Sequence, residues 1–363
     1  MGHSSLMRCG VLDIGSRTVH LKIADLFPGR PPEPVASWKQ PVRLADATDR
    51  QGVIPREAIR SLVGAVTASA AAASAHHVDR LIPFATSAVR DATNRDAVLD
   101  EIEAASGIRV GFMSGVEEAR LTFRAVRGWL GWSAGRILLL DIGGGSLEIA
   151  CGSGTDPALA ISLPLGADRL TRHHLPDATP VKKRDVKALR RHVRATLGQG
   201  TAELRAQPAP LSCVATSRTF AQLARLAGTR ESGNGLPAAH SLSRKELLPW
   251  VSRLAVKTDR QRAKLRGISA SRAHQCLAGA IVAEAAMEVM AVKRLTICPW
   301  ALREGVLLDH LSRLEGERSE FMTAPFMTAP RAIRALPQEA YPPEGARQRT
   351  VTASSSPPAT ARG

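Results

Sequence analysis

Two segments of the chain share one pattern of hydrophobic and polar positions: an apolar run, a short turn with aspartate and glycine, and alternating residues. The first is CGVLDIGSRTVHLKI, with an apolar run to Leu12, a turn over residues 13–17 and alternation over residues 18–23. The second is RILLLDIGGGSLEIACG, over residues 136–152. Apolar runs and period-two alternation predict strands, so each copy predicts a strand, a tight turn and a second strand.

Helical periodicity surrounds these units. Apolar residues spaced by three and four predict helices over residues 54–75 and 114–130. Ser114 and Glu117 are spaced as a capping box at the start of the second helix. Patterns of strand, loop and helix lie at residues 79–94, 212–228 and 294–311. This mixture predicts an α/β protein, and the repeated strand–turn–strand unit predicts a cleft between two related halves.

The same patterns give expected domain boundaries. We predict a leader over residues 1–6, a first domain over residues 7–130, a second domain over residues 131–300 and a disordered tail over residues 315–363. The tail repeats FMTAP and then continues with Pro, Ser, Thr and Arg without periodicity. A helix over residues 301–314 is expected to pack back on the first domain.

The amino-acid composition narrows the classes of molecule that the protein is expected to bind. The 363 residues are 44% hydrophobic but only 4% aromatic, so the core is expected to be aliphatic. A net charge of +16 favours polyanionic partners, and the scarcity of aromatic rings argues against nucleic acid. Basic helices over residues 181–197 and 253–272 are either solvated faces or a track for a polyanion.

The chain shows no targeting or membrane signal. The alanine-rich stretch over residues 62–75 is too short and too polar to span a bilayer, and the first ten residues lack an apolar signal region. The five cysteines lie far apart without a CxxC pair, as expected for reduced core residues. We therefore expect a soluble cytoplasmic protein that does not bind membranes.

The glycines after Asp141 match neither common phosphate-binding fingerprint. No lysine follows them, and Glu148 occupies the place of the third glycine of a dinucleotide-binding loop. Free backbone N–H groups in such a turn bind anions, but Asp141 would repel a phosphate. A Mg²⁺ ion between them resolves the conflict, so Asp13 and Asp141 are predicted to face one magnesium–phosphate complex. The alternative is that each aspartate only bonds its own turn.

Six segments in order resemble the motifs of the exopolyphosphatase/guanosine pentaphosphate phosphohydrolase (Ppx/GppA) family: DIGSRTVHL, ATSAVRDATN, SGVEEARLTF, LLLDIGGGSLEIA, LPLGADRLT and ALREGVLL. The resemblance covers about residues 8–313 and is greatest to short members of actinobacterial type. It implies the two-domain actin-like ATPase (ASKHA, ribonuclease H-like) fold with an interdomain cleft. It also implies an enzyme that hydrolyses a terminal phosphoanhydride with Mg²⁺, or Mn²⁺ in its place, and that forms a homodimer.

The resemblance assigns roles to single residues. Glu118 would activate the attacking water, which agrees with the use of its neighbour Glu117 in the cap. Glu148 would orient water or metal, and Arg90 would grip phosphate. The plain alternatives are a helix-dipole acid, an exposed strand residue and a pair with Asp91 or Asp96. The expected phosphate-binding residues of the loops are Gly15, Ser16, Arg17, Thr18, Gly143, Gly144, Gly145, Ser146, Ser217 and Arg218.

Three positions depart from the family's usual residues. Arg17 replaces an asparagine, Arg218 replaces a glycine and His274 replaces an aspartate. The two arginines would either grip a polyanion harder or fill the pocket and slow turnover. We therefore keep several functions: an exopolyphosphatase that prefers short chains, since the chain lacks the extra helical domain of long members; a pppGpp or nucleotide phosphohydrolase; a weakly active polyphosphate- or alarmone-binding regulator; and an actin-like kinase.

Overall fold

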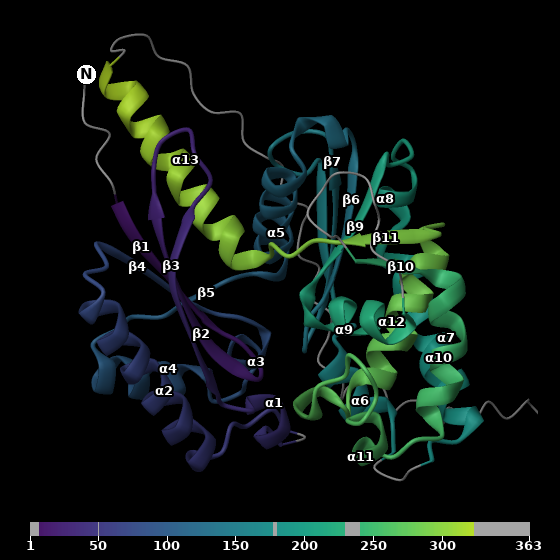
Figure 1. Ribbon diagram of the computed structural model, residues 1–363. Helices are drawn as coiled ribbons and strands as arrows, with labels where there is room; N and C mark the ends of the chain where they lie inside the picture. The colour runs from purple at the N-terminus through teal and green to yellow at the C-terminus, as the bar shows by residue number, and fades with distance from the viewer. Residues whose placement is uncertain (1–6, 50, 177–179, 229–239, 323–363) are drawn as a thin grey trace, which may run out of the picture. The chain divides into compact units, whose positions relative to one another are not determined.

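Two β-sheets with helices around them form the part of the chain that the structure describes (Figure 1). The computed structural model describes residues 7–49, 51–176, 180–228 and 240–322, and residues 1–319 form one compact unit. The predicted leader and residues 323–363 of the predicted tail lie outside the described residues. Residues 315–322, predicted to begin the disordered tail, instead continue the helix over residues 302–322. The division into two domains at residues 130 and 300 stays a prediction.

The first sheet has the strand order β3-β2-β1-β4-β5. Its strands are β1 (Met7–Ile14), β2 (Thr18–Leu26), β3 (Glu33–Pro41), β4 (Arg80–Ala85) and β5 (Gly111–Phe112). The helices of this half are α1 (Leu44–Ala47), α2 (Arg56–Ala75), α3 (Ser87–Arg90) and α4 (Arg95–Ser106). We call this half the first lobe.

The second sheet has the strand order β10-β11-β9-β6-β7-β8. Its strands are β6 (Ile137–Ile142), β7 (Leu147–Gly152), β8 (Leu159–Leu163), β9 (Ser212–Thr216), β10 (Ser241–Ser243) and β11 (Arg294–Ile297). Its helices are α6 (Ala167–His174), α7 (Lys183–Gly200), α8 (Ala202–Arg205), α9 (Ser217–Ala227), α10 (Arg244–Ala255), α11 (Asp259–Arg262) and α12 (Cys276–Val289). We call this half the second lobe.

The predicted internal repeat is confirmed by strand pairing. In the first sheet β1 is antiparallel to β2 and parallel to β4, and in the second β6 is antiparallel to β7 and parallel to β9. Asp13 and Asp141 occupy the same position, one residue before the last residue of β1 and β6. Each lobe therefore presents an aspartate and a glycine turn at the same end of its central strand.

Two helices each follow the elements of one lobe in the chain but pack on the sheet of the other lobe (Figure 1). Helix α5 (Gly115–Leu130) packs on the second sheet through Ala119 and Phe123, although the predicted first domain includes it. Helix α13 (Leu302–Met322) packs on the first sheet through Val306 and Leu307. The N-terminal ends of α5 and α13 both supply residues to the region between the two turns, which positions Glu118 and Arg303 there.

The core is aliphatic, as the composition predicts. Helix α12 is buried on every side from Cys276 to Met287, which is typical of a central core helix rather than an amphipathic one. All five cysteines are free thiols, and every one except the half-buried Cys213 is buried. Helix α2 has the length and composition of a membrane span, but its Leu62 and Val66 belong to a buried cluster of the first lobe.

The cap of α5 forms only in part. The Ser114 hydroxyl accepts a hydrogen bond from the Glu117 N–H at 3.2 Å, as predicted. The Glu117 carboxylate, however, accepts from the Arg120 guanidinium at 2.7 Å instead of completing the capping box. Glu117 is therefore held away from the region between the lobes, by an ion pair rather than by the reciprocal cap.

A substitution at Gly305 tests the packing of α13 on α5. A Cβ at Gly305 would lie 1.9 Å from the backbone oxygen of Leu121, so Gly305→Ala is expected to lower the free energy of unfolding by about 1–3 kcal/mol. The matched control is Gly64→Ala on the exposed face of α2, where a Cβ meets nothing within 4 Å. That change should stabilise by about 0.5–1 kcal/mol. Urea unfolding of both variants measures the difference, and equal effects would contradict the packing.

Candidate active site

A cavity of about 660 Å³, which we call the cleft, lies between the glycine turns of the two lobes. Most of the predicted site residues line it: Asp13, Gly15, Ser16, Arg17, Thr18, Glu118, Asp141, Gly143, Gly144, Ser146, Glu148, Ser217 and Arg218. Two predicted residues do not. Gly145 lines a neighbouring cavity, and Arg90 reaches the cleft only through its contact with Glu118.

The two turns have the same local geometry and touch each other. The Gly15 N–H donates to the Thr18 carbonyl at 3.0 Å, and the Gly143 N–H donates to the Ser146 carbonyl at 2.9 Å. A Cβ added at Gly144 would lie 2.4 Å from Ser16 Oγ. Only glycine permits so close an approach of backbone to a neighbouring group, which explains the residue type at this position.

Four carboxylates line the cleft, and each has a protein donor. Arg303 Nη1 donates to Asp13 Oδ2 at 2.6 Å, and Thr216 Oγ1 donates to Asp141 Oδ2 at 2.6 Å. Arg90 Nη1 donates to Glu118 Oε1 at 3.0 Å, and Ser162 Oγ donates to Glu148 Oε1 at 2.8 Å. The fold therefore brings the four acids that were predicted from the sequence to one cavity.

Burial shifts the protonation of all four acids in one direction. Burial raises the pKa of Glu118 well above its ordinary value, and the nearby Glu148 charge adds to the shift while Arg90 opposes it. Burial, reinforced by Asp141, raises the pKa of Glu148 to about 7. The pKa values of Asp13 and Asp141 are also raised, again mainly by burial. Acids with raised pKa values that share a cleft are typical of catalytic sites.

Arg90 contacts both the predicted catalytic acid Glu118 and Asp91, its alternative partner. Its Nε donates to Asp91 Oδ1 at 3.0 Å, and its Nη1 donates to the Met113 carbonyl at 2.7 Å as well as to Glu118. The side chain is one-fifth exposed. Arg90 thus orients Glu118, and its predicted contact with phosphate stays a prediction.

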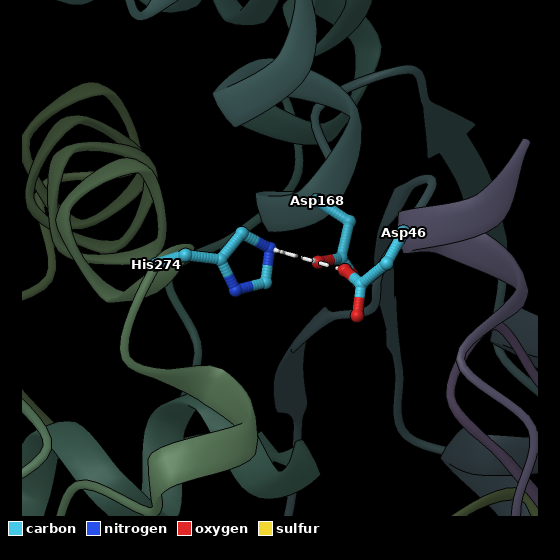
Figure 2. A group of neighbouring side chains, drawn as sticks. All are labelled: Asp46, Asp168 and His274. Atoms are coloured by element: carbon cyan, nitrogen blue, oxygen red, sulfur yellow. Dashed lines mark ion pairs between the residues drawn. The ribbon is translucent and has the colours of Figure 1, made fainter. Parts of the chain in front are cut away.

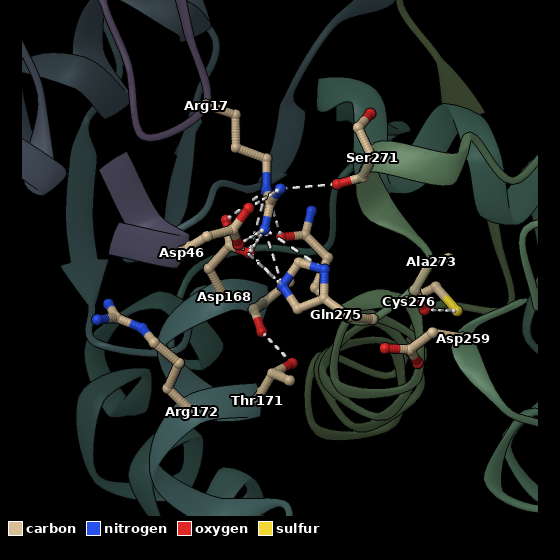
Figure 3. A network of polar contacts seen from close by, with 12 residues as sticks. Arg17, Asp46, Asp168, Thr171, Arg172, Asp259, Ser271, Ala273, Gln275 and Cys276 are labelled. Atoms are coloured by element: carbon tan, nitrogen blue, oxygen red, sulfur yellow. Dashed lines mark hydrogen bonds and ion pairs between the residues drawn. The ribbon is translucent and has the colours of Figure 1, made fainter. Parts of the chain in front are cut away.

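The Arg17 guanidinium is bound by protein groups rather than free to bind a phosphate (Figure 3). Its Nη2 lies 2.7 Å from Asp46 Oδ1 and 2.7 Å from Asp168 Oδ1, and its Nη1 donates to the Ser271 carbonyl at 2.7 Å. The guanidinium is committed to these protein groups, and the Arg17 side chain is only 6% exposed. The prediction that Arg17 grips phosphate did not anticipate this network.

The network includes a set of possible metal ligands. Asp46, Asp168 and His274 offer ligand atoms within 4.8 Å of one another (Figure 2). Arg17 Nη2 contacts all three, with His274 Nε2 at 2.8 Å. A guanidinium therefore occupies the position that a metal ion would take. Burial alone would raise the pKa of Asp168, but hydrogen bonds from His274 and Arg17 outweigh it and lower that pKa.

Sequence reasoning missed several residues of the cleft. Arg303 lies inside the motif ALREGVLL, and its position directly after the break at Pro299 was the available signal. Lys39 comes from the edge strand β3 and lies outside the six motifs. Arg272 lies in a short 3-10 helix over residues 270–272, at the end of the basic stretch for which a track for a polyanion was one interpretation. The missed cleft residues with charged side chains are Lys39, Arg225, Arg272 and Arg303.

Comparison with known proteins decides the family. The model of the Ppx/GppA phosphatase family matches residues 22–314 of this chain. The chain belongs to the Ppx/GppA phosphatase family. The predicted family, the actin-like fold and the enzyme class of phosphoanhydride hydrolases are thereby confirmed.

Individual relatives agree with this assignment. The chain is 46% identical over 308 residues to Exopolyphosphatase 1 of Mycobacterium leprae, covering 84% of this chain and 90% of that protein. A guanosine-5'-triphosphate,3'-diphosphate pyrophosphatase of Photobacterium profundum is 26% identical, over 84% of this chain and 59% of its own length. The crystal structure of an exopolyphosphatase from Cytophaga hutchinsonii superimposes with a TM-score of 0.73 at 26% identity, covering 85% and 98% of the two chains.

The raised pKa of Glu118 gives a test of its role. Because its folded pKa lies above the unfolded value, the buried charge costs stability as the pH rises above that pKa. Glu118→Gln should therefore raise the melting temperature more at pH 8 than at pH 5. It should also lower kcat for phosphate release by about 10²- to 10⁴-fold, the usual contribution of a general base.

The control for this experiment is Glu117→Gln. Glu117 is adjacent in sequence, lies outside the cleft and pairs with Arg120. It should retain the wild-type kcat. A Glu118→Gln enzyme with wild-type kcat, or one that is destabilised at pH 8, would contradict the assignment.

Proposed function

We propose that the enzyme is an exopolyphosphatase, which hydrolyses the terminal phosphoanhydride of inorganic polyphosphate with Glu118 as the general base. The observation that carries the proposal is the composition of the cleft. Four acids and two glycine turns share it with a group of cations, and its described lining contains no tryptophan, tyrosine or phenylalanine. The one imidazole that lines it, His20, is buried. This combination suits a linear polyanion better than a nucleoside.

The cations of the cleft are available to a ligand. Lys39, Arg218, Arg225 and Arg272 line the same cavity as the acids. Within the described ranges, no ion pair joins any of these four to a carboxylate. Burial and the neighbouring cations, Arg218 among them, lower the pKa values of Lys39 and Arg272. Lys39, Arg218 and Arg225 are exposed and Arg272 is half-buried. Cations gathered in one cavity without counter-charges repel one another, and a chain of phosphates would neutralise them.

The acids fit the predicted magnesium ion. Four carboxylates carry more negative charge than Arg303 and Arg90 can neutralise, and no described cation pairs with Asp141. Carboxylates beside phosphate oxygens are a typical Mg²⁺ site, so Asp13 and Asp141 would hold the ion, or Mn²⁺ in its place. When bound, the ion would neutralise charge on the phosphate oxygens.

The remaining steps belong to residues of the chain. The Gly15 and Gly143 N–H groups are used within their own turns, so the other backbone N–H groups of the two turns would hold the terminal phosphate. Glu118 would take a proton from water as the water attacks the terminal phosphorus. The bond from that phosphorus to the bridging oxygen would break, releasing orthophosphate and a chain shorter by one phosphate. Arg90 would keep Glu118 in place.

Two alternatives carry less support. Guanosine polyphosphates present the same terminal bond, and a more distant relative is named for such a substrate. The only ring in the described cleft lining, however, is the imidazole of His20, which is 7% exposed and hydrogen-bonded to Ser37, so little ring surface is free to stack on guanine. A weakly active binding protein would require arginines that block the site. Arg17 is held by protein groups, and Arg218 lines the cleft beside other cations. We also infer a preference for short chains, because the four cations beside the acids line a single cavity of about 660 Å³.

The substrate proposal has a direct test. Purified enzyme is offered short-chain polyphosphate, pppGpp and ATP, each with Mg²⁺ and with EDTA, and phosphate release is measured. We expect the highest kcat/KM for polyphosphate and loss of activity with EDTA. Arg218→Met should raise KM for polyphosphate about tenfold, the effect of one charged hydrogen bond, with little change in kcat.

The matched control is Arg56→Met, an exposed arginine that pairs with Glu101 on the surface. It should leave both constants unchanged. A higher kcat/KM for pppGpp than for polyphosphate would overturn the substrate assignment, and full activity in EDTA would overturn the metal.

A further inference from the structure

A second cavity lies directly against the cleft. Its volume is about 210 Å³, and it shares Ser16, Ser87 and Gly144 with the cleft. Arg17 lines the cleft and Asp168 lines the second cavity. The two side chains are joined by an ion pair of 2.7 Å. These shared and paired residues form the partition between the two cavities, which we call the wall.

The wall is tightly packed. A Cβ at Gly144 would lie 2.4 Å from Ser16 Oγ and 2.9 Å from Asp168 Oδ2. A Cβ at Gly145 would lie 2.4 Å from Ser87 Oγ. At these two glycines the turns of the two lobes meet without space for a methyl group, so there is no room for a phosphate between Gly144 and Ser16 or between Gly145 and Ser87.

Arg17 fastens the wall across the two lobes (Figure 3). It extends from the β1–β2 turn of the first lobe to Asp168 in the first turn of α6 in the second lobe. Asp168 is itself tied to the other glycine turn, because its N–H donates to the Gly144 carbonyl at 3.0 Å. Asp46 and His274 contact the same guanidinium nitrogen, from the first and the second lobe respectively.

All four catalytic acids and all four unpaired cations line the cleft, on one side of this wall. A phosphate at the end of a chain has one bridging neighbour, so it can lie against the wall with the chain over the cations. An internal phosphate has a neighbour on both sides, and one of them would have to occupy the wall. We propose that Arg17 and Asp168 close the cleft at the acids and so restrict hydrolysis to chain ends, an inference that rests on the proposed function.

The reaction products distinguish the two kinds of cut. Attack of water on the terminal phosphorus releases orthophosphate and leaves the number of chain ends unchanged. Attack on an internal phosphorus breaks one bridging bond and creates two new ends. Phosphorus NMR, which separates end groups from internal groups, counts these ends during the reaction.

The first experiment uses the wild-type enzyme with Mg²⁺ and polyphosphate whose two terminal phosphates are blocked as esters. We expect phosphate release from free chains at a constant number of ends, and blocked chains hydrolysed at least about 100-fold more slowly. Blocked chains cut at a rate similar to free chains would overturn the proposal. Inactivity toward free chains would instead overturn the proposed function, so the two failures are distinguishable.

The second experiment removes the ion pair between Arg17 and Asp168. Arg17→Ala should permit internal cuts: new ends appear with free chains, and blocked chains become substrates. Arg17→Lys keeps one charge without the fork of donors and should give an intermediate fraction of internal cuts. Arg172→Ala is the control, since Arg172 lines the second cavity without contacting Arg17 or Asp168 by a hydrogen bond. It should stay restricted to ends.

Folding of each variant is checked by circular dichroism. A folded Arg17→Ala enzyme that still cuts only at ends and leaves blocked chains intact would overturn the role of Arg17. If Arg17→Ala does not fold, the lysine variant and the blocked chains still decide the outcome.

Discussion

The contact between two glycine turns, one from each lobe, is the constraint on which the rest of the site depends. Gly144 meets Ser16 so closely that a side chain at this glycine would not fit. This contact sets the separation of β1 and β6, whose ends carry Asp13 and Asp141. Because the lobes repeat one topology, bringing their turns together also brings together two equivalent acids.

This arrangement concentrates negative charge where water is scarce. Burial raises the pKa values of Asp13, Glu118, Asp141 and Glu148, so the free fold holds four acids in an unfavourable environment. Arg303 and Arg90 offset part of this cost, and the aliphatic core around α12 supplies the stability that tolerates it. A phosphate chain with its metal would complete the charge balance, which is how binding and catalysis become linked.

The cleft also shows that an arginine near a glycine turn is not necessarily free to bind phosphate. Arg17 lies in the β1–β2 turn and Arg218 in the first turn of α9. Arg218 faces the open cleft, whereas Arg17 is enclosed by Asp46, Asp168 and His274. One position thus lines the space in which we propose that the substrate binds, and the other holds the geometry of the site. His274, which departs from the family's usual aspartate, is a partner of Arg17, so two departures from the family pattern meet in one contact.

The sequence alone determined the family, the repeated strand–turn–strand unit and the four acids. These follow from local patterns: apolar runs predict strands, glycines mark close backbone approach, and motif order predicts which acid faces the turn. Tertiary structure alone decided that α5 covers the second sheet, that Arg303 pairs with Asp13, and that Arg17 closes the cleft. Each of these depends on contacts between residues far apart in the chain, as in the 151 residues that separate Arg17 from Asp168. A local pattern cannot predict which distant group will meet a long, flexible cation.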